Sequence, residues 1–384
     1  MRRRLWFSPI LMCTSRRVLV WATACLVVSM FSMARAGVIN PDISVIGQPF
    51  FSMNDDPLNP ERNRVRFDIG ETEFVFDAYL NPYARGTFIT TLTGEGFELE
   101  EGYFNLFRSL PLGLALKGGK YRVGFGRLNP IHPHANPFAE PFLVLRTYLP
   151  GDEGLNETGV SLSERIPVHG DFSLNIAADW LQGDTFRIER EPTDDPNDPI
   201  TLGGDDQAGE SRSAGAGRLS GFAMLGEQSA LEFGLSATAG TNNVAAGTIT
   251  QVYGADVKAK LWFSPRSYMV LQAEALMLDR EDATWSPGSE YSSTSVDPVG
   301  GYFYADYNFG LRYNLGASYE RFQEPSADEP WTQAVGAFAG FSLLEETTVF
   351  RLDYVHLNPE VGDDTNQVTL RIIYSMGPHK AHSF

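Results

Sequence analysis

Apolar and polar side chains alternate along most of this chain in runs of about ten residues. In residues 172–181 the apolar positions are Phe172, Leu174, Ile176, Ala178 and Trp180, and they are separated by Ser173, Asn175 and Asp179. Residues 73–80 and 368–375 alternate in the same way. A helix would instead space its apolar residues three and four apart. The pattern therefore predicts β-strands that each carry one apolar face.

The links between these runs follow a second pattern, in which short and long connections alternate. Short turns are expected near 81–82, 111–112, 168–170, 226–228, 264–266 and 344–346. Longer polar links are expected near 127–155, 184–212, 242–248, 280–298, 323–330 and 358–366. Sorting the loops by length in this way is typical of a transmembrane up-and-down antiparallel β-barrel with short periplasmic turns and long outer loops. A Greek-key sandwich has no reason to do so.

The alternation also gives a strand count. Fifteen runs are recognisable, near 71–80, 83–93, 97–108, 113–126, 156–167, 171–182, 213–226, 229–241, 249–263, 267–279, 299–307, 310–322, 331–343, 346–357 and 367–376. Because single-chain bacterial barrels have an even number of strands, residues 43–53 are expected to supply one more. The prediction is an all-β barrel of sixteen strands. Fourteen is the alternative count, since 97–108 alternates poorly and the turn within 299–322 is not located.

The first 36 residues have the pattern of a cleaved export signal. Five arginines lie within 2–17, an apolar run occupies 18–33, and Ala34-Arg35-Ala36 follows. A charged region, an apolar region and a small-x-small site define a signal peptide. An N-terminal membrane anchor is the alternative, but sixteen apolar residues are short for a spanning helix. We therefore expect a signal peptide over 1–36, a barrel over 37–384, and a place in the outer membrane of a Gram-negative bacterium.

Cleavage would remove both cysteines and six arginines, and the remaining chain would have 24 basic and 48 acidic residues, a net charge of −24. Such a charge excludes nucleic acid as a partner. The expected partners are outer-membrane lipid and lipopolysaccharide, the barrel-assembly machinery, small solutes or cations, and further copies of the chain. Residues 184–212 alone carry nine acids, so the outer vestibule is expected to favour cations.

Charged residues on the polar side of the strands are expected to line the lumen, because a sixteen-stranded barrel is wide enough to hold water. The predicted lining residues are Glu73, Asp77, Arg85, Lys120, Arg122, Asp179, Asp256, Lys258, Lys260, Glu274, Arg312, Glu320, Arg351, Asp353 and Arg371. These charges are of mixed sign. They either tune selectivity or merely neutralise one another.

Two histidines in the first long outer loop form the clearest candidate metal site. His132 and His134 are one residue apart, and Glu140 follows closely. Two imidazoles and a carboxylate are ligands suited to zinc. A second pair, His379 and His382, lies near the C-terminus, at the other end of the barrel unless the loop folds into the lumen. The alternative is that prolines stiffen this loop and its histidines only bond its backbone. No cofactor other than zinc is expected.

Residues 118–167, from GGKYRVGFGRLNPIHPHANPF to LSERIP, resemble outer-membrane proteins of the porin superfamily that includes phosphate-selective porins. They are most similar to a subgroup described as zinc-regulated outer-membrane receptor or porin-like proteins, as are NPDISVIGQ at 40–48 and FELEEGYF at 97–104. The resemblance implies a sixteen-stranded porin barrel and a link to metal supply. It departs from phosphate-selective members because the chain has only five lysines. The chain is also too short to include a plug domain beside such a barrel.

The predicted function is therefore a porin-like channel for passive or weakly selective diffusion of small solutes or ions, with cations favoured and a link to zinc uptake. The alternative is a binding or adhesion barrel that acts through its long loops. An enzyme is not expected, because no nucleophile lies beside His169 or His356 in a recognisable arrangement.

Overall fold

In the computed structural model the barrel unit begins at Pro41, and the structure describes residues 41–94, 96–107, 110–188, 200–201, 212–285, 292–343 and 347–377. Its strands are β1 (Asp42–Gly47), β2 (Phe50–Asn54), β3 (Arg66–Asp68), β4 (Thr72–Asn81), β5 (Ala84–Leu92), β6 (Phe97–Leu106), β7 (Ala115–Arg122), β8 (Asn156–His169), β9 (Phe172–Leu181), β10 (Ile200–Thr201), β11 (Ala214–Leu225), β12 (Ser229–Asn243), β13 (Thr248–Ser264), β14 (Ser267–Trp285), β15 (Ser292–Val296), β16 (Val299–Phe309), β17 (Tyr313–Gln323), β18 (Trp331–Ser342), β19 (Thr348–Pro359) and β20 (Thr365–Met376). The helices are η1 (Pro111–Gly113), η2 (Pro133–Ala135), α2 (Leu143–Tyr148) and η3 (Asp184–Phe186). The predicted signal peptide, His379, His382 and most of the acidic 184–212 link lie outside the described residues.

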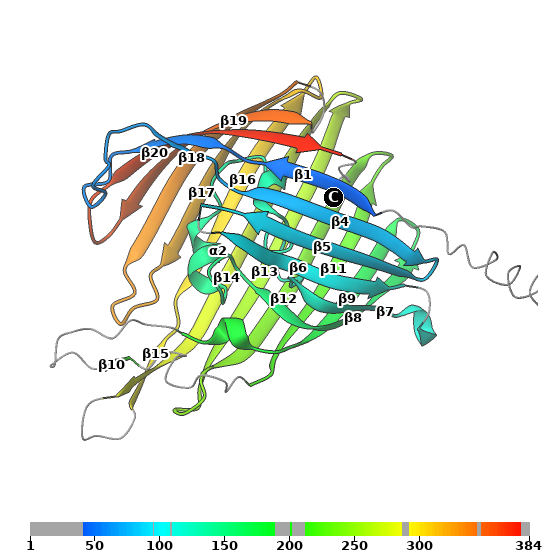
Figure 1. The fold of residues 1–384 in the computed structure, drawn as a ribbon, viewed down its shortest axis with the longest axis horizontal. Coiled ribbons are helices and arrows are strands. Elements are labelled where there is room, and N and C mark those ends of the chain that lie inside the picture. The colour runs from blue at the N-terminus through cyan, green and yellow to red at the C-terminus, as the bar shows by residue number, and fades with distance from the viewer. Residues whose placement is uncertain are drawn as a thin grey trace, which may run out of the picture. The chain divides into compact units, whose positions relative to one another are not determined.

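These strands form one closed antiparallel sheet (Figure 1). Each of the pairs β1 with β2, β3 with β4 and β15 with β16 continues a single crossing of the wall, and β10 extends the edge of β14. The barrel closes where β1 and β2 pair with β20 while β1 also pairs with β4. Sixteen crossings result, so the predicted all-β barrel and its count of sixteen are confirmed. The run expected near 43–53 is the first crossing.

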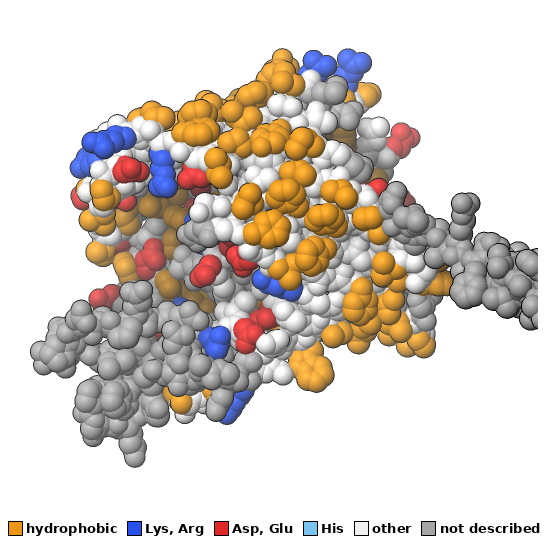
Figure 2. Space-filling view, in the orientation of Figure 1, with side chains coloured by type: hydrophobic (Ala, Val, Ile, Leu, Met, Phe, Trp, Pro, Cys, Tyr) orange, Lys and Arg blue, Asp and Glu red, His pale blue; other side chains and the backbone are white. Residues whose placement is uncertain are grey.

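The outer surface of the strands is apolar, as the alternation predicts. Leu235 in β12, Phe303 in β16 and Leu352 in β19 are between 44% and 61% exposed. Hydrophobic side chains gather over the visible strands in Figure 2. Among the described residues, no helix has both the length and the apolar character needed to cross a bilayer.

Two local features explain where the strand pattern was hard to read. Opposite β5 the register shifts between Ile89 and Thr90, so that β6 carries an extra residue and both Glu100 and Glu101 are buried. A bulge of this kind breaks strict alternation, which is why 97–108 alternates poorly. The turn that the sequence left unplaced joins β16 to β17 at 310–312, with Gly310 and Leu311 at positive φ.

Residues 123–155, here called the inserted segment, join β7 to β8 and fold into the barrel. The segment hydrogen-bonds to inner-face side chains of β4, β12, β14, β17 and β19. Because these strands lie around the whole circumference of a closed sheet, a segment that contacts all of them must lie inside. The loop predicted at 127–155 therefore occupies the lumen, as Figure 1 shows for α2.

Candidate functional site: the inserted segment and the wall around it

The inserted segment packs against the wall through aromatic side chains. Phe142 stacks on Tyr302 of β16, with ring centroids 4.1 Å apart and planes 11° from parallel. Phe138 meets the rings of Tyr304 and Phe338 edge-on at 5.3 and 5.7 Å. All five rings are at least 95% buried. This contact is a small hydrophobic core inside the barrel, and it fixes the position of the segment.

Carboxylates of the wall hold the backbone of the same segment. Val144 donates its backbone N–H to Glu320 in β17 at 3.1 Å, and Arg127 donates its backbone N–H to Glu274 in β14 at 3.3 Å. Asp353 in β19 accepts the backbone N–H of Ala139. Charged acceptors make stronger hydrogen bonds than neutral ones. These three predicted lining residues therefore attach the segment to the wall.

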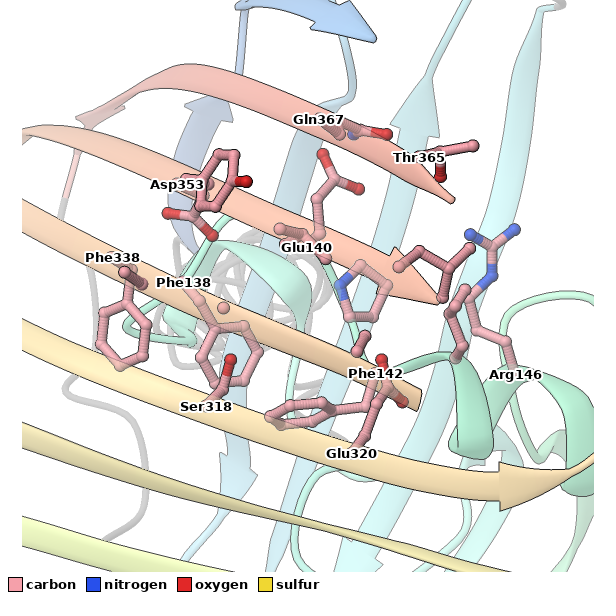
Figure 3. Close-up of a pocket in the computed structure, with 18 residues that line it drawn as sticks. Phe138, Glu140, Phe142, Arg146, Ser318, Glu320, Phe338, Asp353, Thr365 and Gln367 are labelled. Carbon is pink, nitrogen blue, oxygen red and sulfur yellow. The ribbon is translucent and has the colours of Figure 1, made fainter. Parts of the chain in front are cut away.

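A cavity of about 190 Å³ remains between the segment and strands β17 to β20. Figure 3 shows Phe138, Glu140, Phe142 and Arg146 of the segment facing Glu320 and other residues of these strands. A second cavity, of about 230 Å³, lies between residues of the segment and the side chains of Glu71 and Arg122, and both cavities border Arg146. The segment therefore occupies part of the lumen and borders a cavity on each of these sides.

The histidine pair lies where the segment meets β4 and β6. Pro133 begins η2 and holds His132 in an extended conformation, so that the two imidazoles lie side by side with centroids 5.7 Å apart. His134 Nδ1 donates to Glu73 Oε1 at 2.7 Å, and His132 Nε2 donates to Glu101 Oε1 at 2.6 Å. His132 Nδ1 lies 3.5 Å from Glu73 Oε2. The acid–histidine cluster is defined here as Glu73, Glu100, Glu101, His132 and His134.

This cluster is strongly acidic. Glu100, whose Oε1 lies 3.3 Å from His132 Nδ1, also forms an ion pair with Arg122 at 2.7 Å. Burial lowers the pKa of His132, but the neighbouring carboxylates of Glu100, Glu101 and Glu73 outweigh burial and raise that pKa to about 10. The site therefore favours positive charge between its carboxylates.

Many of the predicted lining residues form ion pairs or hydrogen bonds with other inner-face groups. Asp77 pairs with Arg85 at 2.6 Å, Asp256 pairs with Arg218 at 2.6 Å, and Asp179 accepts the Tyr121 hydroxyl at 2.8 Å. The other basic residues predicted to line the lumen lie as follows. Lys258 is half-buried, and Lys260 lies over the Tyr268 ring. Arg351 donates to the His134 carbonyl, and Arg371 lies 3.9 Å from Glu140.

Three residues that were expected to line the lumen or to bind metal do not lie at those sites. Tyr121 points inward, so its neighbour Lys120 faces outward and donates to the Leu99 carbonyl at 2.9 Å. Arg312 is exposed in the turn between β16 and β17. Glu140, the expected third metal ligand, accepts from Thr369 at 3.2 Å and does not join the acid–histidine cluster.

Several inner residues were not predicted. Arg218 lies at an inward position of its strand, so the alternation of side chains could have predicted it. The same is true of Glu232, which pairs with Arg127. Lys117, which lies over the Tyr121 ring at 5.0 Å, replaces Lys120 as the inward lysine of β7. Nothing in the sequence indicated that Glu73 would bind a histidine, because Glu73 is 61 residues from His134.

Comparison with known proteins supports the fold. No family model matches the chain. An uncharacterized protein of Aquifex aeolicus is 30% identical over 283 residues, which are 68% of this chain and 55% of that protein; the chain thus matches about half of the relative's length. Among solved structures, an anion-selective porin from Comamonas acidovorans has a TM-score of 0.57 at 11% identity, over 88% of this chain and 99% of that one. The outer-membrane channel DcaP of Acinetobacter baumannii has a TM-score of 0.54 at 12% identity, over 88% and 97%. The barrel therefore has the fold of outer-membrane porins.

Proposed function

We propose that this protein is a porin-like channel in the outer membrane of a Gram-negative bacterium, and that the inserted segment narrows its lumen. The observation that carries the proposal is a closed barrel of sixteen crossings whose inner face is charged and whose outer face is apolar. Side chains alone fill a barrel of eight strands, whereas sixteen strands enclose a lumen. The channel passes small solutes or ions by diffusion and performs no chemistry.

The charges around the cavity of Figure 3 support a preference for cations. Glu320 and Asp353 lie on its wall, and Glu140 faces it from the segment. One arginine, Arg146, borders the same cavity. A narrow space with an excess of carboxylates concentrates cations and repels anions. We extend the proposal to zinc among these cations, because histidines and carboxylates meet at the neighbouring acid–histidine cluster.

The proposed setting follows from the same fold. The barrel-assembly machinery inserts the chain, and lipid and lipopolysaccharide surround the apolar band. A Vibrio cholerae outer-membrane protein of similar fold, OmpT, has been solved in a trimer form, with a TM-score of 0.54 at 9% identity. We include a homo-oligomer in the proposal on this ground.

The test is a planar-bilayer recording of the purified, refolded barrel in a KCl gradient. We expect discrete conductance steps and a reversal potential of the sign that K⁺ selectivity gives. The double variant Glu320→Gln/Asp353→Asn keeps hydrogen-bond acceptors but loses two negative charges, so its reversal potential moves towards zero. Glu227→Gln, in the exposed turn between β11 and β12, is the matched control and leaves it unchanged.

Heat-modifiable migration in a detergent gel establishes that each variant is folded. A folded wild-type barrel that never conducts contradicts the channel proposal and leaves binding through the loops as the function to test. Conductance with a reversal potential of the opposite sign retains the channel and contradicts the cation preference.

A further inference from the structure

The acid–histidine cluster brings together side chains with the spacing of a metal site. Ligand atoms of Glu73, His132 and His134 all lie within 4.8 Å of one another. Two of their N···O separations are 2.7 and 3.5 Å. Tetrahedral zinc with bonds of about 2.0–2.1 Å sets neighbouring ligands about 3.3 Å apart. Small movements of these side chains would therefore satisfy the coordination sphere.

Unpartnered atoms point to the same place. Glu73 Oε2, Glu100 Oε2 and His132 Nδ1 are buried and have no hydrogen-bond partner within the described chain. Glu73 is 1% exposed. Buried polar atoms are normally paired, and here two carboxylate oxygens and a ring nitrogen are orphaned together. A cation between Glu73 and His132 would satisfy both.

The surrounding groups support the ligands as metal sites require. Glu101 accepts from His132 Nε2 at 2.6 Å, which leaves the Nδ1 atom of that ring directed at Glu73 and Glu100. A carboxylate on the far nitrogen is the usual means of orienting a histidine ligand. Gln48 donates to Glu73 Oε1 at 3.2 Å and so orients the carboxylate of this proposed ligand.

We propose that Glu73, His132 and His134 bind a divalent transition-metal ion of the zinc type, with Glu100 as the fourth ligand. Imidazole nitrogens favour zinc and its neighbours over Mg²⁺ and Ca²⁺, which prefer oxygen ligands alone. Two ligands belong to the inserted segment and two belong to the wall, on β4 and β6. The ion therefore ties the segment to the wall. Any effect of this link on conduction rests on the channel function proposed above.

The experiment is isothermal titration of ZnCl₂ into the untagged, refolded barrel after chelation, with MgCl₂ as the comparison. We expect one Zn²⁺ per chain and no comparable Mg²⁺ binding. His132→Gln/His134→Gln removes the site, and Glu73→Gln weakens it at least tenfold. His169→Gln/His356→Gln, which changes two histidines outside the cluster, leaves binding intact.

The C-terminal histidines need their own control. His379→Gln/His382→Gln is expected to retain the full Zn²⁺ stoichiometry. Loss of binding in this variant, unchanged binding in the folded His132→Gln/His134→Gln protein, or no Zn²⁺ binding by the wild type would each overturn the proposal.

Conductance separates this inference from the channel function. Zn²⁺ is expected to lower the open probability of the wild type and to leave His132→Gln/His134→Gln unaffected. Conductance without Zn²⁺ binding refutes the metal site and preserves the channel. Stoichiometric Zn²⁺ binding by a barrel that never conducts preserves the site and refutes the channel.

Discussion

Replacing Phe142 by alanine should release the inserted segment from the wall. The ring is 5% exposed, stacks on Tyr302 at 4.1 Å and lies 5.0 Å from Phe138. Truncating a buried phenylalanine costs about 3–5 kcal/mol. At 1.4 kcal/mol per factor of ten, the equilibrium between the inserted and released segment shifts by roughly 100-fold or more towards release.

The assay is single-channel recording at fixed voltage, together with limited trypsin digestion. Phe142→Ala should show longer and larger open steps than the wild type. It should also be cleaved faster at Arg127 and Arg146, because both lie in the segment. The control is Phe303→Ala, which removes a ring from the outer face of β16, where Phe303 is 44% exposed. That variant should match the wild type in both assays.

The reasoning is refuted if folded Phe142→Ala keeps the wild-type conductance and the wild-type cleavage rate. Such a result would mean that the aromatic contact does not determine the position of the segment. Equal increases in Phe142→Ala and Phe303→Ala would point to a general loosening of the barrel, and would equally contradict the prediction.

Further predictions concern the wall and the segment. Gly126 has a φ of +57°, and a Cβ there would overlap the Glu274 carboxylate, so Gly126→Ala should raise conductance, whereas Gly247→Ala, at a φ of +73° with open space around it, should not. Leu235, 61% exposed near the middle of β12, faces lipid, so Leu235→Arg should destabilise the folded barrel by about 2–4 kcal/mol in a urea titration in lipid vesicles; an unchanged midpoint would contradict the lipid-facing assignment. Tyr121→Phe removes the hydroxyl that binds Asp179 and should lower the temperature of heat modification, with a loss of about 1–3 kcal/mol; an unshifted temperature would contradict it.

The strands were predictable because each obeys a local rule. Side chains such as Asp179 and Trp180 face opposite sides of the wall because successive residues of a strand must do so. The rule fails where the backbone departs from a regular strand. The extra residue in β6 buries both Glu100 and Glu101, and the turn after Phe309 takes Arg312 out of the wall.

The path of the inserted segment was a different kind of problem. Residues 138–149 are rich in Phe, Leu and Val, which is unusual for an outer loop and was a signal that this stretch is buried. The strands that it contacts could not be inferred, because those contacts depend on closure of the whole barrel. Pairing of His134 with Glu73 instead of Glu140 follows from that closure.

The charge of the lumen and the position of the segment depend on each other. Glu274, Glu320 and Asp353 accept hydrogen bonds from backbone N–H groups of the segment. If the segment leaves, these carboxylates lose their backbone partners, face water in the lumen and become available to passing ions. The released state should therefore conduct more and also discriminate more strongly for cations than the inserted state. Recording the reversal potential of Phe142→Ala beside that of the wild type tests this coupling, since a wider but uncoupled lumen would lose selectivity as its conductance rises.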